Sequence, residues 1–279
     1  MAPSRRATRS RTRRPHPPPR RHRLATTFFR QTKRAVVAFA AASGKVQVVV
    51  GAIVLVGAWV TLNVAYQVIR KPTELFFPVA GTLSKMPRDT WRDYAPLFRE
   101  YATRTMTPAL LAALAQVEGS GNPVAHTYWR WEWSTNPLKW YRPASSAVGM
   151  YQITDGTFAE ARRYCVHNHV VTETTRWYDV HGCWFNWAYT RVLPSHAIEM
   201  TSALLDREVA DVVSRRRTPP TARQVQDLAA AIHLCGEGGG ETFAHHGFVA
   251  TGLRCGDHSL ASYLAEVNAM KREFARFEH

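Results

Sequence analysis

Apolar residues follow two patterns along this chain, and the first is a continuous run. Residues 46–69, VQVVVGAIVLVGAWVTLNVAYQVI, carry no charge and are apolar on every face. At about 1.5 Å per residue, a helix of this length crosses about 30 Å of hydrocarbon. A buried core helix is the alternative, but core helices of globular domains usually keep a polar face. The run therefore predicts a single transmembrane helix over 45–71.

The second pattern has apolar residues at helical spacing and surrounds Glu118. Thr107 is a good N-cap, and Pro108 suits the first helical turn. Gly119 and Gly121 then end the helix. The apolar residues of this helix fall on one face: Leu110, Leu111, Leu114 and Val117. Glu118 follows Leu114 by four residues, so it projects from that apolar face.

A carboxyl group on an apolar face is a candidate proton donor. We expect burial to disfavour the charged form of a glutamate at this position, as it does for carboxyl groups in general. Such a carboxyl can protonate a leaving oxygen, as the acids of glycoside hydrolysis do. The alternative is a helix-end glutamate that reaches solvent or pairs with an arginine.

Helical spacing recurs in three further stretches, at 91–101, 225–234 and 260–277. Thr154 is expected to cap another helix that starts near Thr157. The stretch 91–101 lies in a proline-interrupted linker and is expected to pack on the domain as its first helix. The stretch 225–234 is expected to pack against the helix that carries Glu118, and the stretch 260–277 is expected to close the domain. These elements predict a mostly α-helical fold.

Charge is distributed very unevenly and indicates how the chain is oriented. Residues 1–45 hold thirteen Lys and Arg and no acid, whereas only Arg70 and Lys71 follow the apolar run directly. The positive-inside rule then places the N-terminus in the cytoplasm. A cleaved signal peptide with its apolar core at 35–42 is the alternative, and so is a basic arm that binds nucleic acid. We expect an uncleaved anchor and no nucleic-acid partner.

The same patterns divide the chain into four parts. Residues 1–44 form a disordered basic cytoplasmic tail, and 45–71 form the transmembrane helix. Residues 72–106 are the linker with its packing helix, and 107–279 are the extramembrane domain. From residue 74 onward 21 basic residues face 21 acidic ones, so the domain itself is close to neutral.

Four cysteines lie in the part expected outside the cytoplasm, where disulfides persist. Three pairings are open, and we favour the sequence-local one, Cys165–Cys183 with Cys235–Cys255. The alternative is zinc bound by cysteines and nearby histidines, but no regular ligand spacing is present. We expect disulfides and no metal.

Three motifs between residues 107 and 270 carry a resemblance to a known family. They are EGSGNPVA at 118–125, AVGMYQITDGTF at 147–158 and AAIHLCGEGGG at 230–240. In this order they resemble the ESGxNP-type, GLMQIMPGT-type and AYNAGPG-type motifs of the soluble lytic transglycosylases. The resemblance implies a lysozyme-like helical fold and cleavage of the glycan strands of bacterial peptidoglycan.

The resemblance also implies roles for individual residues. Glu118 takes the place of the single catalytic acid and base, and Gln152 lines the sugar cleft beside it. Gly149 allows close backbone approach, and Asn122 with Pro123 shapes the turn behind the glutamate. The residues expected at the substrate site, besides Gln152, are Gly149, Met150, Tyr151, Ser146, His233 and Asn122.

The implied reaction needs only one carboxyl. In the resembled family the N-acetyl group of the substrate stabilises the cation-like intermediate. Glu118 would protonate the oxygen between MurNAc and GlcNAc and then accept the proton of the C6 hydroxyl of the same MurNAc. The product is a 1,6-anhydroMurNAc end, formed without water and without a metal or organic cofactor.

The chain also departs from the family pattern. The segment 126–143, HTYWRWEWSTNPLKWYRP, is an aromatic-rich addition that is read either as a saccharide-binding lid or as packed core. His233 replaces a tyrosine, and it either hydrogen-bonds Glu118 or is a satisfied core histidine. Glu237 follows in the glycine-rich loop, where a second carboxyl would permit a lysozyme-like hydrolysis.

These observations predict a single-pass protein of the bacterial inner membrane with its catalytic domain in the periplasm. Its expected function is lytic cleavage of the MurNAc–GlcNAc bond, and its expected partners are glycan strands and the membrane. By analogy, it would open the wall for an envelope-spanning secretion machine. The alternatives are a lysozyme-like hydrolase of the same bond and an inactive peptidoglycan-binding scaffold.

Overall fold

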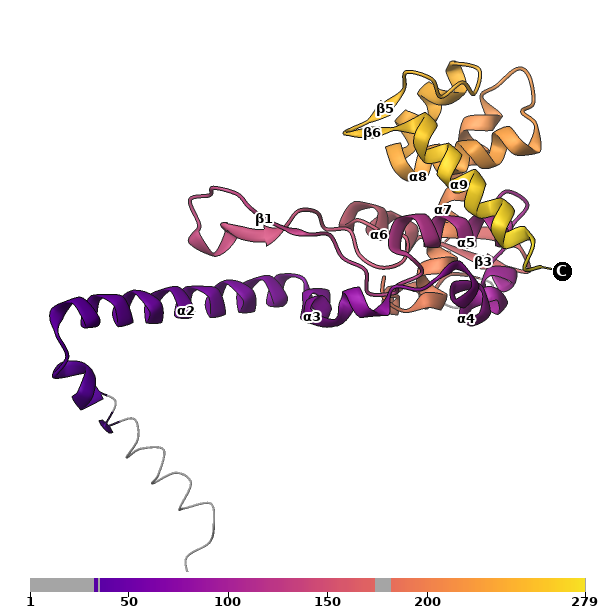
Figure 1. The fold of residues 1–279 in the computed structure, drawn as a ribbon. Helices are drawn as coiled ribbons and strands as arrows, with labels where there is room; N and C mark the ends of the chain where they lie inside the picture. Colours follow the sequence, from indigo (N-terminus) through magenta and orange to yellow (C-terminus); the bar gives the residue numbers. More distant parts are fainter. Residues whose placement is uncertain (1–32, 35, 174–181, 279) are drawn as a thin grey trace, which may run out of the picture. The chain divides into compact units, whose positions relative to one another are not determined.

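The structure is a computed structural model that describes residues 33, 34, 36–173 and 182–278. Most of the tail expected over 1–44 lies outside the described residues. The chain divides into two compact units, residues 1–62 and 63–279, and each is considered by itself. The described part is mostly helical, as the sequence predicts (Figure 1).

The apolar run forms helix α2 (Gly44–Arg70), within one residue of the predicted bounds at both ends. Among the described residues it is the one helix long and apolar enough to cross a membrane. The part of α2 in the first unit exposes large apolar side chains, among them Val48, Ile53 and Leu55. The core helix of a soluble protein would bury such residues. The two buried residues of the helix, Asn63 and Gln67, are polar and belong to the second unit.

The second unit is built around one buried helix. Its longer helices are α4 (Pro87–Glu100), α5 (Pro108–Gly119), α7 (Pro194–Ser214), α8 (Ala222–His245) and α9 (Leu260–Ala275). Short helices are η1 (Pro72–Phe76), α3 (Phe77–Ala80), η2 (Gly81–Leu83), η3 (Pro137–Lys139), α6 (Asp155–Ala161) and η4 (Asn186–Ala188). Helices α4 and α9 pack on α5, and α7 packs on α8 (Figure 1). The α5 helix thus forms the centre of the core.

Helix α5 has the ends that its sequence predicts. The Thr107 side chain accepts a hydrogen bond from the Leu110 N–H at 3.4 Å, and Pro108 occupies the first turn. Ser120 follows the helix in the left-handed conformation with φ of 51°. Its N–H caps the carbonyls of the last turn, so the chain turns sharply directly after Glu118.

The predicted packing helix and the predicted closing helix meet each other. Trp91 of α4 packs against Phe98 and against Phe274 of α9, and its indole N–H donates to the Phe277 carbonyl at 3.1 Å. An aromatic side chain buried in this way contributes about 3 kcal/mol or more to stability. The linker therefore ends inside the core of the domain.

Three antiparallel hairpins extend from this helical core. They are β1 (Trp129–Trp131) with β2 (Tyr141–Pro143), β3 (Tyr164–His167) with β4 (Val170–Glu173), and β5 (Arg254–Cys255) with β6 (His258–Ser259). The first hairpin is the aromatic segment 126–143. Because Tyr128, Trp131 and Trp133 are exposed, this segment is not the packed core that one interpretation of the sequence expected.

All four cysteines are paired in the predicted, sequence-local way. Cys165 bonds Cys183, and Cys235 bonds Cys255. With every thiolate used in a disulfide, the cysteine–zinc alternative loses its ligands. Cys235 directly precedes Gly236, whose φ of 72° breaks the helical path inside α8. The predicted helix 225–234 is therefore the first half of α8, and a second half continues beyond the kink.

Candidate active site

Glu118 lies at the C-terminal end of α5 and is largely shielded from water. Its side chain retains 18 % of its accessible area. The Tyr263 hydroxyl, from α9, donates a 2.5 Å hydrogen bond to Oε1 of Glu118. The Nε2 atom of His233, from α8, lies 3.8 Å from the same oxygen. Three helices thus bring a carboxyl, a phenol and an imidazole together.

Tyr263 is held in the protonated form that it needs in order to donate. Burial raises its pKa well above 10, and the negative charge of Glu118 and the hydrogen bond to it raise that pKa further. Since Tyr263 is buried on α9, which packs on α5, its hydroxyl holds the carboxyl group in one orientation. Both of these contacts are made by Oε1, and Oε2 is the oxygen that we expect to meet a ligand.

The motif at 147–158 forms a tight turn directly against the end of α5. Val148 and Ile153 exchange backbone hydrogen bonds of 3.2 and 3.0 Å across it. Gln152 adopts a left-handed conformation with φ of 48°, and its side-chain N–H donates to the Gly149 carbonyl at 3.0 Å. A non-glycine residue in this region carries backbone strain, which is common at functional sites.

Gly119 is the point where helix and turn touch. A Cβ atom built on Gly119 would lie 2.8 Å from Met150 Cα and 2.9 Å from the Met150 carbonyl oxygen. Both are backbone atoms and cannot rotate away. The absence of a side chain at position 119 therefore allows the turn that carries Gln152 to pack beside Glu118.

Gly119→Ala is expected to destabilise the domain by about 1–3 kcal/mol, because the added methyl forces two backbones apart. Gly156→Ala is the matched control, since Gly156 is helical and has nothing within 4 Å of its Cβ position. Thermal unfolding of the full chain in detergent measures both. Equal unfolding temperatures for the two variants would contradict this packing.

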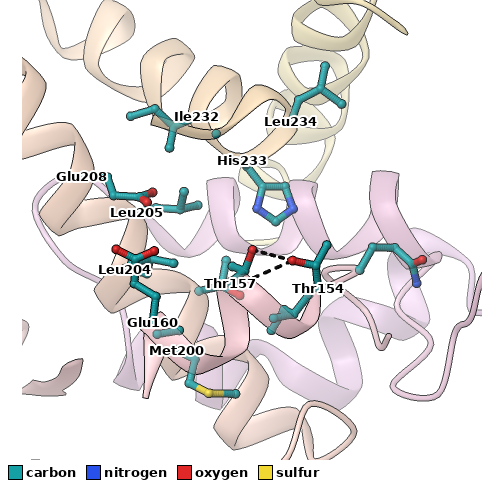
Figure 2. A pocket seen from close by; sticks show the side chains of 15 residues that line it. Thr154, Thr157, Glu160, Met200, Leu204, Leu205, Glu208, Ile232, His233 and Leu234 are labelled. Atoms are coloured by element: carbon teal, nitrogen blue, oxygen red, sulfur yellow. Dashed lines mark hydrogen bonds between the residues drawn. The ribbon is translucent and has the colours of Figure 1, made fainter. Parts of the chain in front are cut away.

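A cavity of about 240 Å³ opens beside the site, between α6, α7 and α8 (Figure 2). Gln152 and His233 line it, together with Thr154 and Thr157. Figure 2 shows His233 directed toward these two threonines, with Glu160 and Glu208 to the left of them. Glu118 does not line the cavity itself. It lies 3.8 Å from Nε2 of His233, and His233 does line the cavity. The carboxyl is thus adjacent to the cavity, separated from it by one side chain.

Glu208, which lines the cavity, has a carboxyl group with a raised pKa. Burial, followed by the nearby charges of Glu160, Glu237 and Asp211, raises the pKa of Glu208 to about 7. The folded state holds this proton between pH 4.5 and 7, whereas the unfolded chain has lost it. Folding stability therefore falls as the pH rises through this window, and the deficit persists above it.

Glu208→Gln is expected to remove that deficit. At pH 8 the variant should be more stable than the wild type by about 1–2 kcal/mol, a value discounted for partial solvent exposure. Below pH 4.5 the difference should vanish. Unfolding curves at both pH values test this, with Glu266→Gln at an exposed position as the control. A wild-type-to-variant difference that does not change with pH would refute it.

Met150 and Tyr151 are buried beneath the site. The sequence predicted that they would face the sugar, and they do not. Neither side chain has exposed area. The Tyr151 hydroxyl donates to the Leu111 carbonyl of α5 at 3.1 Å, and its ring meets His233 edge to face. Burial also raises the pKa of Tyr151 well above 10. These two residues support the site by packing.

Asn122 and Ser146 also hold the backbone and lie away from the cavity. The Asn122 amide donates to the Ala80 carbonyl at 2.5 Å, and its Oδ1 accepts from the Val124 N–H at 3.0 Å. Asn122 therefore shapes the turn after Glu118, as predicted, but does not face a substrate. The Ser146 hydroxyl accepts from the Asp155 N–H at 3.1 Å, which fixes the start of α6.

Glu237 does not take the position that a second catalytic carboxyl would need. It is exposed, forms a 3.5 Å ion pair with Arg215 and does not line the cavity. The carboxyls that do line the cavity, Glu160 and Glu208, come from α6 and α7. Glu237 is therefore not the second cavity carboxyl that the glycine-rich loop suggested.

Tyr263 and Arg191 were not identified from the sequence. Tyr263 shares a helix face with Leu260, Leu264 and Val267, and a tyrosine on an apolar face usually has a partner for its hydroxyl. That signal was available, but it does not name Glu118 as the partner. Arg191 donates to the carbonyls of Ser146 and Ile153, both at 2.9 Å, and so clamps the two ends of the turn.

Comparison with known proteins adds no relative to this geometry. The chain matches no protein-family model, no curated protein and no solved structure.

Proposed function

We propose that this chain is a membrane-anchored peptidoglycan lytic transglycosylase that cleaves the MurNAc–GlcNAc bond. The observation that carries the proposal is the shielded carboxyl of Glu118, oriented by the Tyr263 hydroxyl and adjacent to a cavity lined by Gln152 and His233. A proton donor fixed beside a concave surface is what cleavage of a glycosidic bond requires.

The orientation of the carboxyl supports the two proton transfers of this reaction. In the acid form, Oε1 accepts the Tyr263 hydrogen bond and Oε2 carries the proton. Transfer of that proton to the glycosidic oxygen breaks the bond and leaves a carboxylate, which the same hydrogen bond stabilises. The carboxylate then takes the proton of the MurNAc C6 hydroxyl. As the C6 oxygen attacks C1, the 1,6-anhydro ring forms and Glu118 is again protonated.

The proposal includes an uncleaved membrane anchor with the domain in the periplasm. Helix α2 is of sufficient length and is apolar, and basic residues are concentrated before it. Two disulfides in the second unit fit an oxidising compartment. Anchoring would keep the catalytic domain close to the inner membrane, where it would act on the glycan strands nearest the cell.

Release of soluble fragments from purified sacculi tests the enzymatic claim. The full chain in detergent is expected to solubilise glycan fragments in proportion to time and to protein concentration. A sedimentation assay with the same sacculi measures binding separately. Binding without release would refute the enzyme and favour an inactive peptidoglycan-binding scaffold.

One observation favours the lysozyme-like hydrolase as the second candidate. Glu160 and Glu208 place additional carboxyls in the cavity, and hydrolysis of this bond commonly uses two carboxyls. However, the pKa of about 7 leaves Glu208 largely protonated below neutral pH, and a protonated carboxyl cannot activate water. This argues against Glu208, though not against Glu160, as the second carboxyl. The shielded and oriented carboxyl of Glu118 supports the single-carboxyl reaction as the first proposal.

A further inference from the structure

The hairpin β1–β2 exposes aromatic side chains that the catalytic proposal does not use. Trp133 keeps 89 % of its accessible area, Tyr128 70 % and Trp131 67 %. The rings contact one another, with Trp133 5.4 Å from Trp140 and Trp131 5.0 Å from Tyr141 between centroids. None of these residues lines the cavity. This group, Tyr128, Trp131, Trp133 and Trp140, is called the aromatic tip below.

The base of this hairpin is fixed directly after the end of α2. The Trp129 indole N–H donates to Oε2 of Glu74 at 2.8 Å, and Oε1 of Glu74 forms a 2.8 Å ion pair with Lys71. Lys71 also donates to the carbonyls of Ser145 and Ala147, both at 3.2 Å. The chain entering and leaving the hairpin is thus tied to the first residues that follow the helix.

The turn of the hairpin lies further back along the same helix. The Leu138 carbonyl accepts hydrogen bonds from Asn63 at 2.9 Å and from Gln67 at 2.8 Å. These donors lie in the last two turns of α2, and Asn63 precedes Arg70 by about 10 Å along the helix axis. From base to turn, the hairpin therefore follows the last turns of α2, from Lys71 back to Asn63.

We propose that the aromatic tip rests in the lipid headgroup layer on the periplasmic side of the membrane. This inference depends on α2 being the membrane anchor of the proposed function, but not on catalysis. Tryptophan and tyrosine favour this layer because each combines an apolar ring with a polar N–H or O–H group. Asn63 and Gln67 keep their amide groups satisfied by the hairpin backbone, so two polar residues are tolerated at the end of an apolar helix.

This assignment differs from a saccharide-binding lid. A lid would place its aromatic rings over the cavity beside Gln152, whereas the hairpin turn is hydrogen-bonded to α2.

The hydrogen bonds from Lys71 to the carbonyls of residues 145 and 147 give the docked hairpin a second role. They connect the membrane end of the chain to the segment that leads into the turn 148–153. Membrane docking would then fix the site at a set height above the bilayer.

Site-directed fluorescence in lipid vesicles tests the proposal with the full chain. Since all four native cysteines are in disulfides, a single added cysteine takes an environment-sensitive label selectively. Thr135→Cys labels the hairpin and keeps the aromatic tip intact. Val249→Cys labels an exposed position elsewhere in the second unit, and Val54→Cys labels the apolar run. Vesicles of phosphatidylcholine and phosphatidylglycerol carry either a headgroup spin label or none, and iodide is the aqueous quencher.

The label at 135 is expected to be quenched by the lipid spin label and to be at least about threefold less accessible to iodide than the label at 249. Adding Trp131→Ser and Trp133→Ser should restore iodide access at 135. Equal iodide quenching at 135 and 249, with 54 still quenched by lipid, would overturn the inference and leave the anchor intact. Loss of lipid quenching at 54 would overturn both. Protection at 135 that requires added sacculi would identify a saccharide lid instead.

Discussion

Glu118→Gln is expected to reduce fragment release from sacculi by about 10³-fold, the middle of the range for removing a general acid. The amide keeps the shape of the carboxyl, and its oxygen still accepts the Tyr263 hydrogen bond. The amide cannot supply a proton to the glycosidic oxygen, so kcat falls. Binding to sacculi and the unfolding temperature should stay close to those of the wild type.

Glu237→Gln is the matched control for this variant. It makes the same chemical change at an exposed glutamate that pairs with Arg215 outside the cavity. Release by this variant is expected to remain within about twofold of the wild type, since surface substitutions rarely change more. If Glu118→Gln retained a tenth of wild-type release, Glu118 would not be the acid. If Glu237→Gln lost as much, the carboxyl assignment would have to move to the glycine-rich loop.

Tyr263→Phe is expected to lower kcat by about 10–100-fold and to leave KM nearly unchanged. A hydrogen bond to a charged group contributes about 1.5–3 kcal/mol, and this one stabilises the carboxylate that forms after proton transfer. The high pKa of Tyr263 keeps its hydroxyl a donor across the working pH range. Steady-state release rates over a series of glycan concentrations separate kcat from KM.

Tyr151→Phe distinguishes this positioning role from a loss of stability. Tyr151 is fully buried, and its hydroxyl also donates to α5, but to the Leu111 carbonyl and not to Glu118. Both substitutions remove one hydrogen bond of a buried hydroxyl, so both should cost about 1–3 kcal/mol of unfolding free energy. Only Tyr263→Phe should lose activity. Equal losses of kcat would mean that Tyr263 acts only through the packing of the core.

Local sequence signals predicted the elements that local chemistry determines. Thr107 and Pro108 gave the start of α5, and the continuous apolar run gave α2 to within one residue. Short loops favoured the disulfides that are present, because closing a short loop places two cysteines near each other in any fold. The N-cap at Thr154 is also confirmed, although α6 starts at Asp155, before the expected position.

The partners of Glu118 depend on tertiary packing and could not be predicted in the same way. Tyr263 is 145 positions from Glu118 along the chain, and the hydrogen bond forms only because α9 packs on α5. The same limit applies to Met150 and Tyr151. Their motif suggested that they line the surface of the cleft, but both side chains are buried below it. Asn63 and Gln67 look like interruptions of an apolar helix until the backbone of the hairpin is placed beside them.

Mass spectrometry of the fragments released by the wild-type full chain tests the central claim most directly. Intramolecular attack of the C6 hydroxyl on C1, with one carboxyl as acid and then base, predicts 1,6-anhydroMurNAc ends. These are one water lighter than hydrolytic ends and unchanged by borohydride. Fragments with reducing MurNAc ends, which gain two hydrogens on borohydride treatment, would contradict the single-carboxyl reaction and assign a hydrolase. An absence of fragments under conditions where the protein is folded and bound would contradict glycan cleavage altogether.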